Sequence, residues 1–375
     1  MERRTFLHTV GAAAALPLSA CSGTPQTPAP SDASRPAGHA SGPMRHPLPI
    51  GSPVLDSLKP VIEQSTHVRT NVDKIVEHAG WLAYDELPFP QMAIPFGLEK
   101  NVEQAIDFAM VTNTVNTAFT DFTTSVKFQI DYDGRRRSDS EAMTACFMRA
   151  LAEKVPILDG RYLATLTREQ LVHVFRGGNI EMPMLDEKLA ALREVGQVLV
   201  QKYGGFFHNF IASCSKRLYD HGNGLVDKLV QDFPRFNDVS RYKGAEVKFY
   251  KLTQLGYWGL YSSLRPQKAF PIEDIDTMTA FADYIVPVAM RVMNILEYTP
   301  ELDKAIADGK ELPRDSDEEI EIRAHMLHAT ALLREEINKR RPADLQIIIP
   351  QLDARLWISY HATHWPHHLT RTTMY

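Results

Sequence analysis

The chain has 375 residues, a formal net charge of −5 at pH 7 and 44% hydrophobic residues, which is ordinary for a globular protein with a sizeable core. It has no long basic run, and this argues against binding along a nucleic-acid backbone. No stretch after the N-terminus is apolar enough to span a membrane.

The N-terminus has the pattern of a targeting segment. Arg3-Arg4 resembles a twin-arginine export signal, a short apolar stretch follows, and the residues before Cys21 resemble the lipobox of bacterial lipoproteins. We therefore predict that residues 1–21 are a signal peptide and that Cys21 is lipidated. The protein would then be exported and lipid-anchored on the periplasmic or extracellular face of a bacterial membrane.

The rest of the chain divides into a linker and one domain. Residues 22–53 are rich in Pro, Ala and Ser and have almost no large apolar residues, so they are predicted to form a flexible tether. Residues 54–375 are predicted to form a single large, mainly α domain. Its one strand signal lies at residues 125–136, where apolar residues alternate before an Asp-Gly turn, and this predicts a small β-hairpin.

Helix signals dominate this domain. Asn71 precedes an apolar stripe at helical spacing, and Ser138 with Glu141 and Thr167 with Gln170 have the spacing of capping boxes. Further helices are predicted at about 206–219, 223–232, 246–263, 277–297, 318–339 and 346–361.

Two stretches carry groups suited to chemistry. Residues 236–255 combine turn signals with a carboxylate, aromatic residues and lysines, a mixture that is typical of a site lining. Residues 279–287 place Asp283 inside an otherwise apolar run, where a carboxylate must be paired or functional because burying a bare charge is costly.

These motifs resemble the queuosine salvage family. The resemblance rests on Phe-Asn-Asp at 236–238, Phe-Tyr-Lys at 249–251, Phe-Ala-Asp-Tyr at 281–284 and the closing residues 368–375, and it covers roughly residues 55–375. It implies a fold like that of helical DNA glycosylases and the hydrolysis of queuosine 5'-monophosphate to release the base queuine. It also implies a small-molecule nucleotide as the only ligand, with no metal, no cofactor and no nucleic-acid partner; we expect a monomer.

The reaction would pass through an oxocarbenium-like sugar, which a carboxylate near the anomeric carbon can stabilise. Asp238 matches the family motif and is the predicted catalytic carboxylate, with Asn237 beside it in the site. Asp283 is predicted to bind the base edge or the cationic side chain of queuine. The two roles could be exchanged, and structural roles stay open: a turn or helix cap for Asp238 and a buried ion pair for Asp283.

The resemblance adds further substrate-binding residues. Tyr250 would bind the sugar or the phosphate, and Lys251 would bind the phosphate or pair with an aspartate. The closing motif contributes His368, Arg371 and Tyr375, of which Arg371 is a phosphate-binding candidate.

Asn116 and Phe119 complete the predicted substrate-binding set. The family usually reads Asn-Phe-x-Phe-Trp here, whereas this chain has Thr117 and Thr120 where aromatic residues are expected. Two alternatives therefore stay open: a non-catalytic nucleotide- or base-binding lipoprotein, and a nucleosidase of altered base specificity. Four histidines between His361 and His368 are spaced like metal ligands, but Pro366 interrupts them and no metal site is predicted.

Overall fold

Helix α14, Asp317–Asn338, is buried along most of its length and is the centre of one half of the fold. Ser316 caps its first turn by accepting a hydrogen bond from the Glu319 amide, 3.3 Å away. Its buried Glu321 carboxylate accepts from the backbone amides of residues 66–68 and from the Tyr242 hydroxyl at 2.7 Å. The start of the described chain is thereby fixed to a helix that lies near its end.

The structure is a computed structural model that describes residues 52–90, 98, 100–361 and 363–375. The α-helices are α1 (Pro53–Ser57), α2 (Lys59–Gln64), α3 (Val72–Leu82), α4 (Val102–Thr114), α5 (Asp139–Ala152), α6 (Gly160–Ala164), α7 (Arg168–Val174), α8 (Leu185–Lys202), α9 (Phe207–Ala212), α10 (Leu225–Asp232), α11 (Lys251–Leu264), α12 (Val286–Val292), α13 (Pro300–Ala307), α14 and α15 (Ile349–Tyr360). Short 3-10 turns lie at Pro234–Phe236, Ile275–Thr277 and Ala343–Leu345.

The strands form three small antiparallel pairs. They are β1 (Val68–Thr70) with β6 (Leu296–Tyr298), β2 (Gln129–Tyr132) with β3 (Arg135–Ser138), and β4 (Val239–Tyr242) with β5 (Ala245–Lys248). The described residues form one compact unit. The prediction of a mainly α domain with a small hairpin is therefore confirmed.

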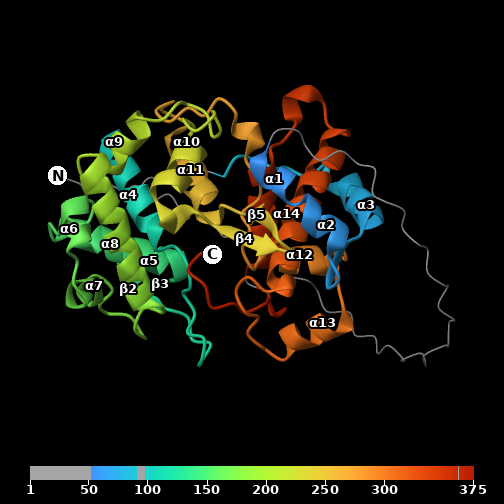
Figure 1. Ribbon diagram of the computed structural model, residues 1–375, viewed down its shortest axis with the longest axis horizontal. Helices are drawn as coiled ribbons and strands as arrows, with labels where there is room; N and C mark the ends of the chain where they lie inside the picture. Colours follow the sequence, from blue (N-terminus) through green and yellow to red (C-terminus); the bar gives the residue numbers. More distant parts are fainter. Residues whose placement is uncertain (1–51, 91–97, 99, 362) are drawn as a thin grey trace, which may run out of the picture. The chain divides into compact units, whose positions relative to one another are not determined.

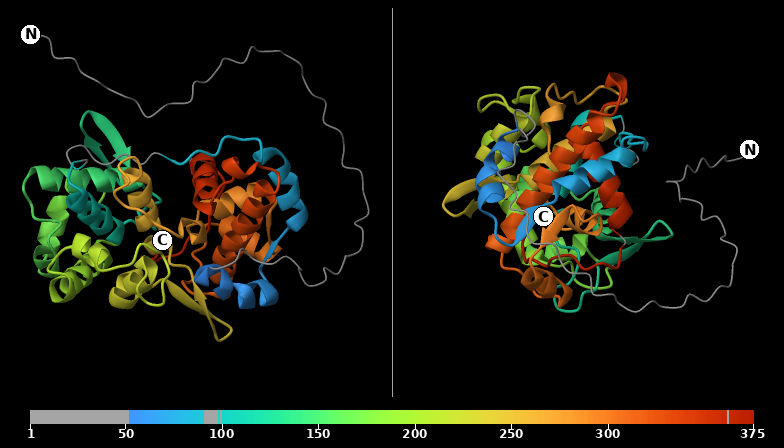
Figure 2. Two further views of the ribbon diagram at one scale, coloured as in Figure 1. Left: turned by 90° about the horizontal axis from the view of Figure 1, so that it is seen from above. Right: turned by 90° about the vertical axis from the view of Figure 1, so that its right-hand side faces the viewer.

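The helices pack in two groups. Helices α4 to α9 pack among themselves, whereas α2, α3, α12 and α15 pack against α14. Helix α11 packs on α4 and α10, and the β4–β5 hairpin that precedes it contacts α1 and α14, so this segment joins the two groups. Figures 1 and 2 show the C-terminus between the groups, close to this junction.

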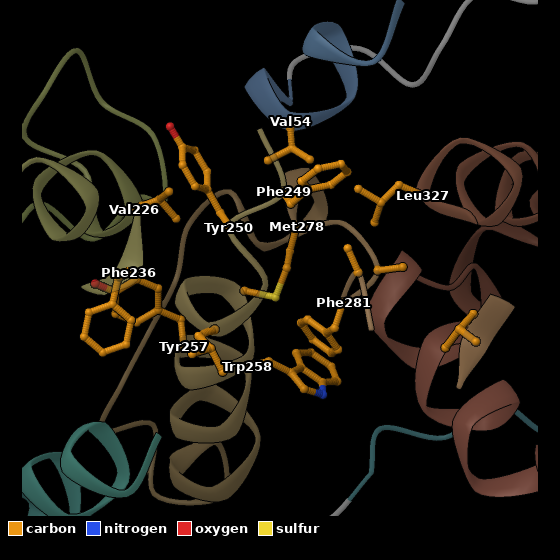
Figure 3. Close-up of a cluster of buried hydrophobic side chains, with 14 of the residues drawn as sticks. Val54, Val226, Phe236, Phe249, Tyr250, Tyr257, Trp258, Met278, Phe281 and Leu327 are labelled. Atoms are coloured by element: carbon orange, nitrogen blue, oxygen red, sulfur yellow. The ribbon is translucent and has the colours of Figure 1, made fainter. Parts of the chain in front are cut away.

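Close packing fixes the position of helix α11. A Cβ atom on Gly256 would lie only 2.6 Å from the Asn113 side-chain nitrogen, which donates a 2.7 Å hydrogen bond to the Leu252 carbonyl. Figure 3 shows Phe249 pointing toward Val54 and Leu327, while the neighbouring Tyr250 points away from them. Tyr250 has a left-handed backbone, at φ 50°, and directly precedes α11.

The structure confirms several local predictions. Asn71 caps α3, Thr167 and Gln170 form both bonds of a capping box, and the predicted hairpin turns at Asp133. Ser138 occupies the N-cap position of α5, but its side chain makes no capping hydrogen bond, so the capping box predicted there with Glu141 is wrong.

Two predicted helices begin too early. Residues 246–248 belong to strand β5, because Lys243 and Gly244, at φ 48° and 88°, close a tight hairpin turn that pairs it with β4. The helix predicted from residue 277 begins at Val286, since Pro287 is tolerated only in a first turn. This leaves residues 278–285 as irregular, mostly buried chain.

The predicted signal peptide, Cys21 and most of the predicted tether lie outside the described residues. Pro53, which was predicted to end the tether, is instead the first residue of α1. Among the helices that the structure describes, none has the length and apolar character needed to cross a membrane.

Candidate functional site

Asp238 lies in a buried ion pair. It follows the 3-10 turn at Pro234–Phe236, and its two carboxylate oxygens accept from the Arg323 guanidinium at 2.6 and 3.2 Å. Its Oδ2 also accepts weakly from the Lys251 amide, 3.3 Å away, and only 2% of Asp238 is exposed. Both oxygens are thus occupied by protein donors in this arrangement.

Arg323 is the centre of this part of the site. Its guanidinium lies between two aromatic rings, 3.9 Å from the centroid of Phe249 and 4.4 Å from that of Tyr375. Its Nη1 atom is 3.5 Å from the buried Glu319 carboxylate. Burial opposes the charge of Arg323, but the Asp238 and Glu319 carboxylates raise its pKa above the ordinary value, so the guanidinium stays charged.

A second buried group, here called the carboxylate–lysine group, consists of Lys251, Asp283 and Asp353. Asp283 caps α12: its Oδ1 accepts from the Ile285 and Val286 amides at 2.8 and 3.2 Å. Asp353, from α15, accepts from the Phe281 amide at 3.0 Å. Residues 278–285 therefore run directly beside α15.

This group combines two buried carboxyl groups with a single buried amine. Burial lowers the pKa of the Lys251 ammonium, although the nearby Asp283 and Asp353 oppose that shift. Burial also raises the pKa of Asp283, and burial together with Asp283 raises that of Asp353 well above its ordinary value. Two carboxyl groups with raised pKa values beside one amine are typical of sites that hold and transfer protons.

Free polar atoms mark this group as the reactive candidate. Among the described residues, the Lys251 Nζ has no hydrogen-bond or ion-pair partner, and the second oxygen of Asp283 accepts no hydrogen bond. Neither atom is among the fully buried side-chain atoms without a partner, so both keep some contact with solvent, and a ligand can take the place of water there. In the Asp238–Arg323 pair, by contrast, both carboxylate oxygens accept hydrogen bonds from the guanidinium.

A pocket, here called the site pocket, lies beside these groups and encloses about 540 Å³ of empty space, its open mouth included. One wall is the segment after α4 and the other is the C-terminal tail. Its lining comprises Ala118, Phe119, Thr120, Asp121, Phe122, Ser125, Tyr284, His367, His368, Leu369, Thr370, Thr372 and Tyr375.

The pocket and the buried groups share residues. Tyr284 lines the pocket directly after Asp283, and its ring packs at 4.4 Å between centroids against His367. Tyr375 has one face in the pocket and its ring against Arg323. Burial lowers the pKa of His368 to about 3, so this imidazole is neutral, and its Nε2 lies 3.2 Å from the Tyr375 hydroxyl.

The structure brings only some of the predicted site residues together. Phe119, His368 and Tyr375 line the site pocket, and Asp238, Asp283 and Lys251 lie buried nearby. The remaining predicted residues do not line it: Asn116, Asn237, Tyr250 and Arg371.

The positions of three of these residues have physical reasons. Tyr250 points to the α10 side of the hairpin, toward Val226, and Asn237 is exposed where its 3-10 turn ends. Arg371 pairs with Glu311 at 2.9 Å and lies over the ring of Phe122, which places it at the rim of the site pocket.

The sequence reasoning missed Arg323, Glu319, Asp353, Tyr284 and His367. A signal for the first two was present: residues 319 and 323 share one face of α14 and the charged residue 321 lies on another, so the charges are not confined to one solvated face. Tyr284 ends the Phe-Ala-Asp-Tyr motif at 281–284, but no separate role was predicted for it. Asp353 gave no signal, because an aspartate in the first half of an amphipathic helix normally faces water.

Comparisons with known proteins identify the family. A family model described as "Queuosine salvage protein" matches residues 96–375. The chain is 32% identical over 325 residues to a protein of Sphaerobacter thermophilus named queuosine 5'-phosphate N-glycosylase/hydrolase, covering 86% of this chain and 97% of that one. It is 30% identical over 257 residues to a protein of the same name from Bos taurus, covering 68% and 72%, and 27% identical over 305 residues to one from Mus musculus, covering 76% and 88%.

These relatives contradict the predicted location. A twin-arginine signal and a lipobox belong to bacterial export, whereas proteins of the same name occur in cattle and mouse, which do not use that route. The prediction of an exported protein with a membrane anchor at Cys21 is therefore wrong. The error arose because short basic, apolar and small-residue patterns were combined into one signal.

Proposed function

The chain belongs to the queuosine salvage protein family, and from this premise we propose that it hydrolyses the N-glycosidic bond of queuosine 5'-monophosphate and releases queuine. The observation that carries the proposal is the buried carboxylate–lysine group, Lys251, Asp283 and Asp353, beside a pocket with aromatic walls. Aromatic faces suit the flat base, and the carboxylates suit the charge that develops on the sugar.

In the proposed reaction, the bond between the anomeric carbon and the base nitrogen breaks and its electron pair stays with the base. Water adds its oxygen to the anomeric carbon, so the products are queuine and ribose 5-phosphate. The base nitrogen must gain a proton and the attacking water must lose one. The site therefore needs one carboxylate that is ionised and one group that still holds a proton.

We assign these roles to Asp283 and Asp353, which moves the catalytic role first predicted for Asp238 to Asp283. Asp283 has a free oxygen and the Lys251 ammonium nearby to favour its charged form. Burial, together with the neighbouring Asp283, raises the pKa of Asp353 well above its ordinary value, which supports its role as the proton donor to the leaving base. Asp238, held by two bonds to Arg323, would position Lys251 at the start of α11.

The test is direct. The purified protein is incubated with queuosine 5'-monophosphate, and queuine and ribose 5-phosphate are measured by chromatography. We expect the two products in equal amounts. Binding of the nucleotide without any product would favour the non-catalytic alternative.

The pocket also bears on base specificity. Thr120 lines it where relatives are expected to carry an aromatic residue, and the buried hydroxyl of Thr117 has no partner among the described residues. These two positions favour the altered-base alternative as the second candidate. A panel of nucleoside monophosphates decides it: faster release of another base than of queuine would replace the proposed substrate.

Arg371 is expected to contribute to phosphate recognition from the rim of the site pocket. Arg371→Ala should raise KM for the monophosphate about fivefold and change KM for the nucleoside less than twofold, because a half-exposed charge is screened by water. The matched control is Glu311→Gln, which removes the carboxylate that pairs with Arg371 but keeps the positive charge of Arg371. If both variants raise KM equally for both substrates, the Arg371–Glu311 pair holds the tail and does not bind phosphate.

A further inference from the structure

Lys188 is a buried lysine that the proposed reaction does not use. It lies in the first turns of α8, is 1% exposed, and has no carboxylate within ion-pair distance among the described residues. A cation is doubly unfavourable here, since it is desolvated and lies near the positive end of a helix dipole. Burial and, to a lesser degree, the neighbouring Arg235 lower the pKa of Lys188 to about 7. Such a residue needs a structural or functional reason.

The contacts of the Lys188 ammonium group give a structural reason for its burial. The Nζ donates to two backbone carbonyls, that of Pro183 at 2.7 Å and that of Ala118 at 3.0 Å. It also lies 5.6 Å from the ring centroid of Phe119. Lys188 therefore links the residues just before α8 to a segment 70 residues earlier in the chain.

That segment is one wall of the site pocket. Ala118 and Phe119 both line the pocket, and Ala118 has a left-handed backbone with φ 49°, which costs energy for a residue with a side chain. A second buried cation acts on the same segment, since the Arg235 Nε donates to the Thr114 carbonyl at 2.8 Å. The start of the irregular chain after α4 is thus held by two buried cations, at Thr114 and at Ala118.

We propose that Lys188 is a positioning residue that fixes this pocket wall, and with it Phe119, for nucleotide binding. The identity of the ligand in this inference rests on the proposed function. The role of Lys188 in fixing the pocket wall does not. Lys188 touches no reacting group, so its loss should weaken substrate binding and leave the chemical step nearly intact.

The experiment compares Lys188→Met with Lys202→Met. Methionine keeps the length of the side chain but cannot donate, and Lys202 lies at the exposed end of the same helix, where it pairs with Asp232. For Lys188→Met we expect KM for queuosine 5'-monophosphate to rise about tenfold, as after the loss of one buried hydrogen bond, with kcat within about twofold. Lys202→Met should match the wild type in both constants.

Amide hydrogen exchange gives a second readout that needs no turnover. Exchange in residues 116–122 should become faster in Lys188→Met, while that in α14 stays unchanged. A wild-type protein without hydrolase activity would overturn the proposed function but leave this readout valid. A folded Lys188→Met with normal KM and normal exchange in this segment would overturn the inference.

Should Lys188→Met fail to fold, Lys188→Arg tests the same idea. The larger planar head keeps the charge and the donors but must displace at least one of the two carbonyls. We expect a raised KM with kcat retained and faster exchange in residues 116–122. An Arg variant with wild-type values for all three would contradict a positioning role.

Discussion

Replacing Asp283 with asparagine is expected to lower kcat by on the order of a hundredfold or more while the protein stays folded. The amide keeps the size of the side chain and can still cap α12 through its oxygen, so the bonds to the Ile285 and Val286 amides persist. What is lost is the negative charge, which matters far more in the transition state than in the bound substrate. Single-turnover rates and nucleotide affinity, measured beside melting curves, give the answer.

A matched control is Asp274→Asn. Asp274 is also a buried carboxylate that accepts from backbone amides, those of Leu218 and Tyr219, but it lies outside the carboxylate–lysine group. Its replacement should leave kcat within about twofold, the scale of a change that makes no transition-state contact. Near-normal turnover in a folded Asp283→Asn would return the catalytic role to Asp238.

For Asp238→Asn we expect a large loss of stability, about 3–5 kcal/mol in the free energy of unfolding. The variant would leave the Arg323 guanidinium charged, 2% exposed and without its bidentate partner. Urea denaturation measures the change. As a comparison, Asp131→Asn breaks an exposed ion pair with Arg136 and should cost less than about 1 kcal/mol.

The double variant Asp238→Asn with Arg323→Met separates structure from chemistry. Removing the guanidinium as well should recover part of the lost stability, because the unpaired charge of Arg323 is then gone, although the buried Glu319 carboxylate loses its partner. An Asp238→Asn protein with wild-type stability but a hundredfold lower kcat would instead support Asp238 as the catalytic carboxylate.

How much the sequence could predict depends on how local each interaction is. The start of α14 at Ser316 and the turn at Asp133 depend on neighbouring residues, and both regions were predicted closely. Asp283 was also identified, because a lone carboxylate in an apolar run is visible without knowledge of the fold. Its capping role was not predicted, since it required the late start of α12 that Pro287 imposes.

The interaction partners of the predicted residues could not be predicted, because these interactions are not local in sequence. Asp238 and Arg323 are 85 positions apart, and nothing in either local pattern specifies that they meet. The β4–β5 hairpin was hidden because its short strands carry charged residues that fit a helix surface equally well. Lys251 begins α11 three residues after β5, so the error in secondary structure also left the position of Lys251 unpredicted.

The bonds of Glu321 have a consequence for how the protein folds. They join residues 66–68 to a helix more than 250 positions later, and α14 also supplies Arg323 to the site. Closing so long a loop is slow, because its entropy is lost before any contact compensates for it. Helices α4 to α9, whose contacts are closer in sequence, can form earlier. The Arg323 side of the candidate site would then form only in the last step of folding, when residues 66–68 meet helix α14.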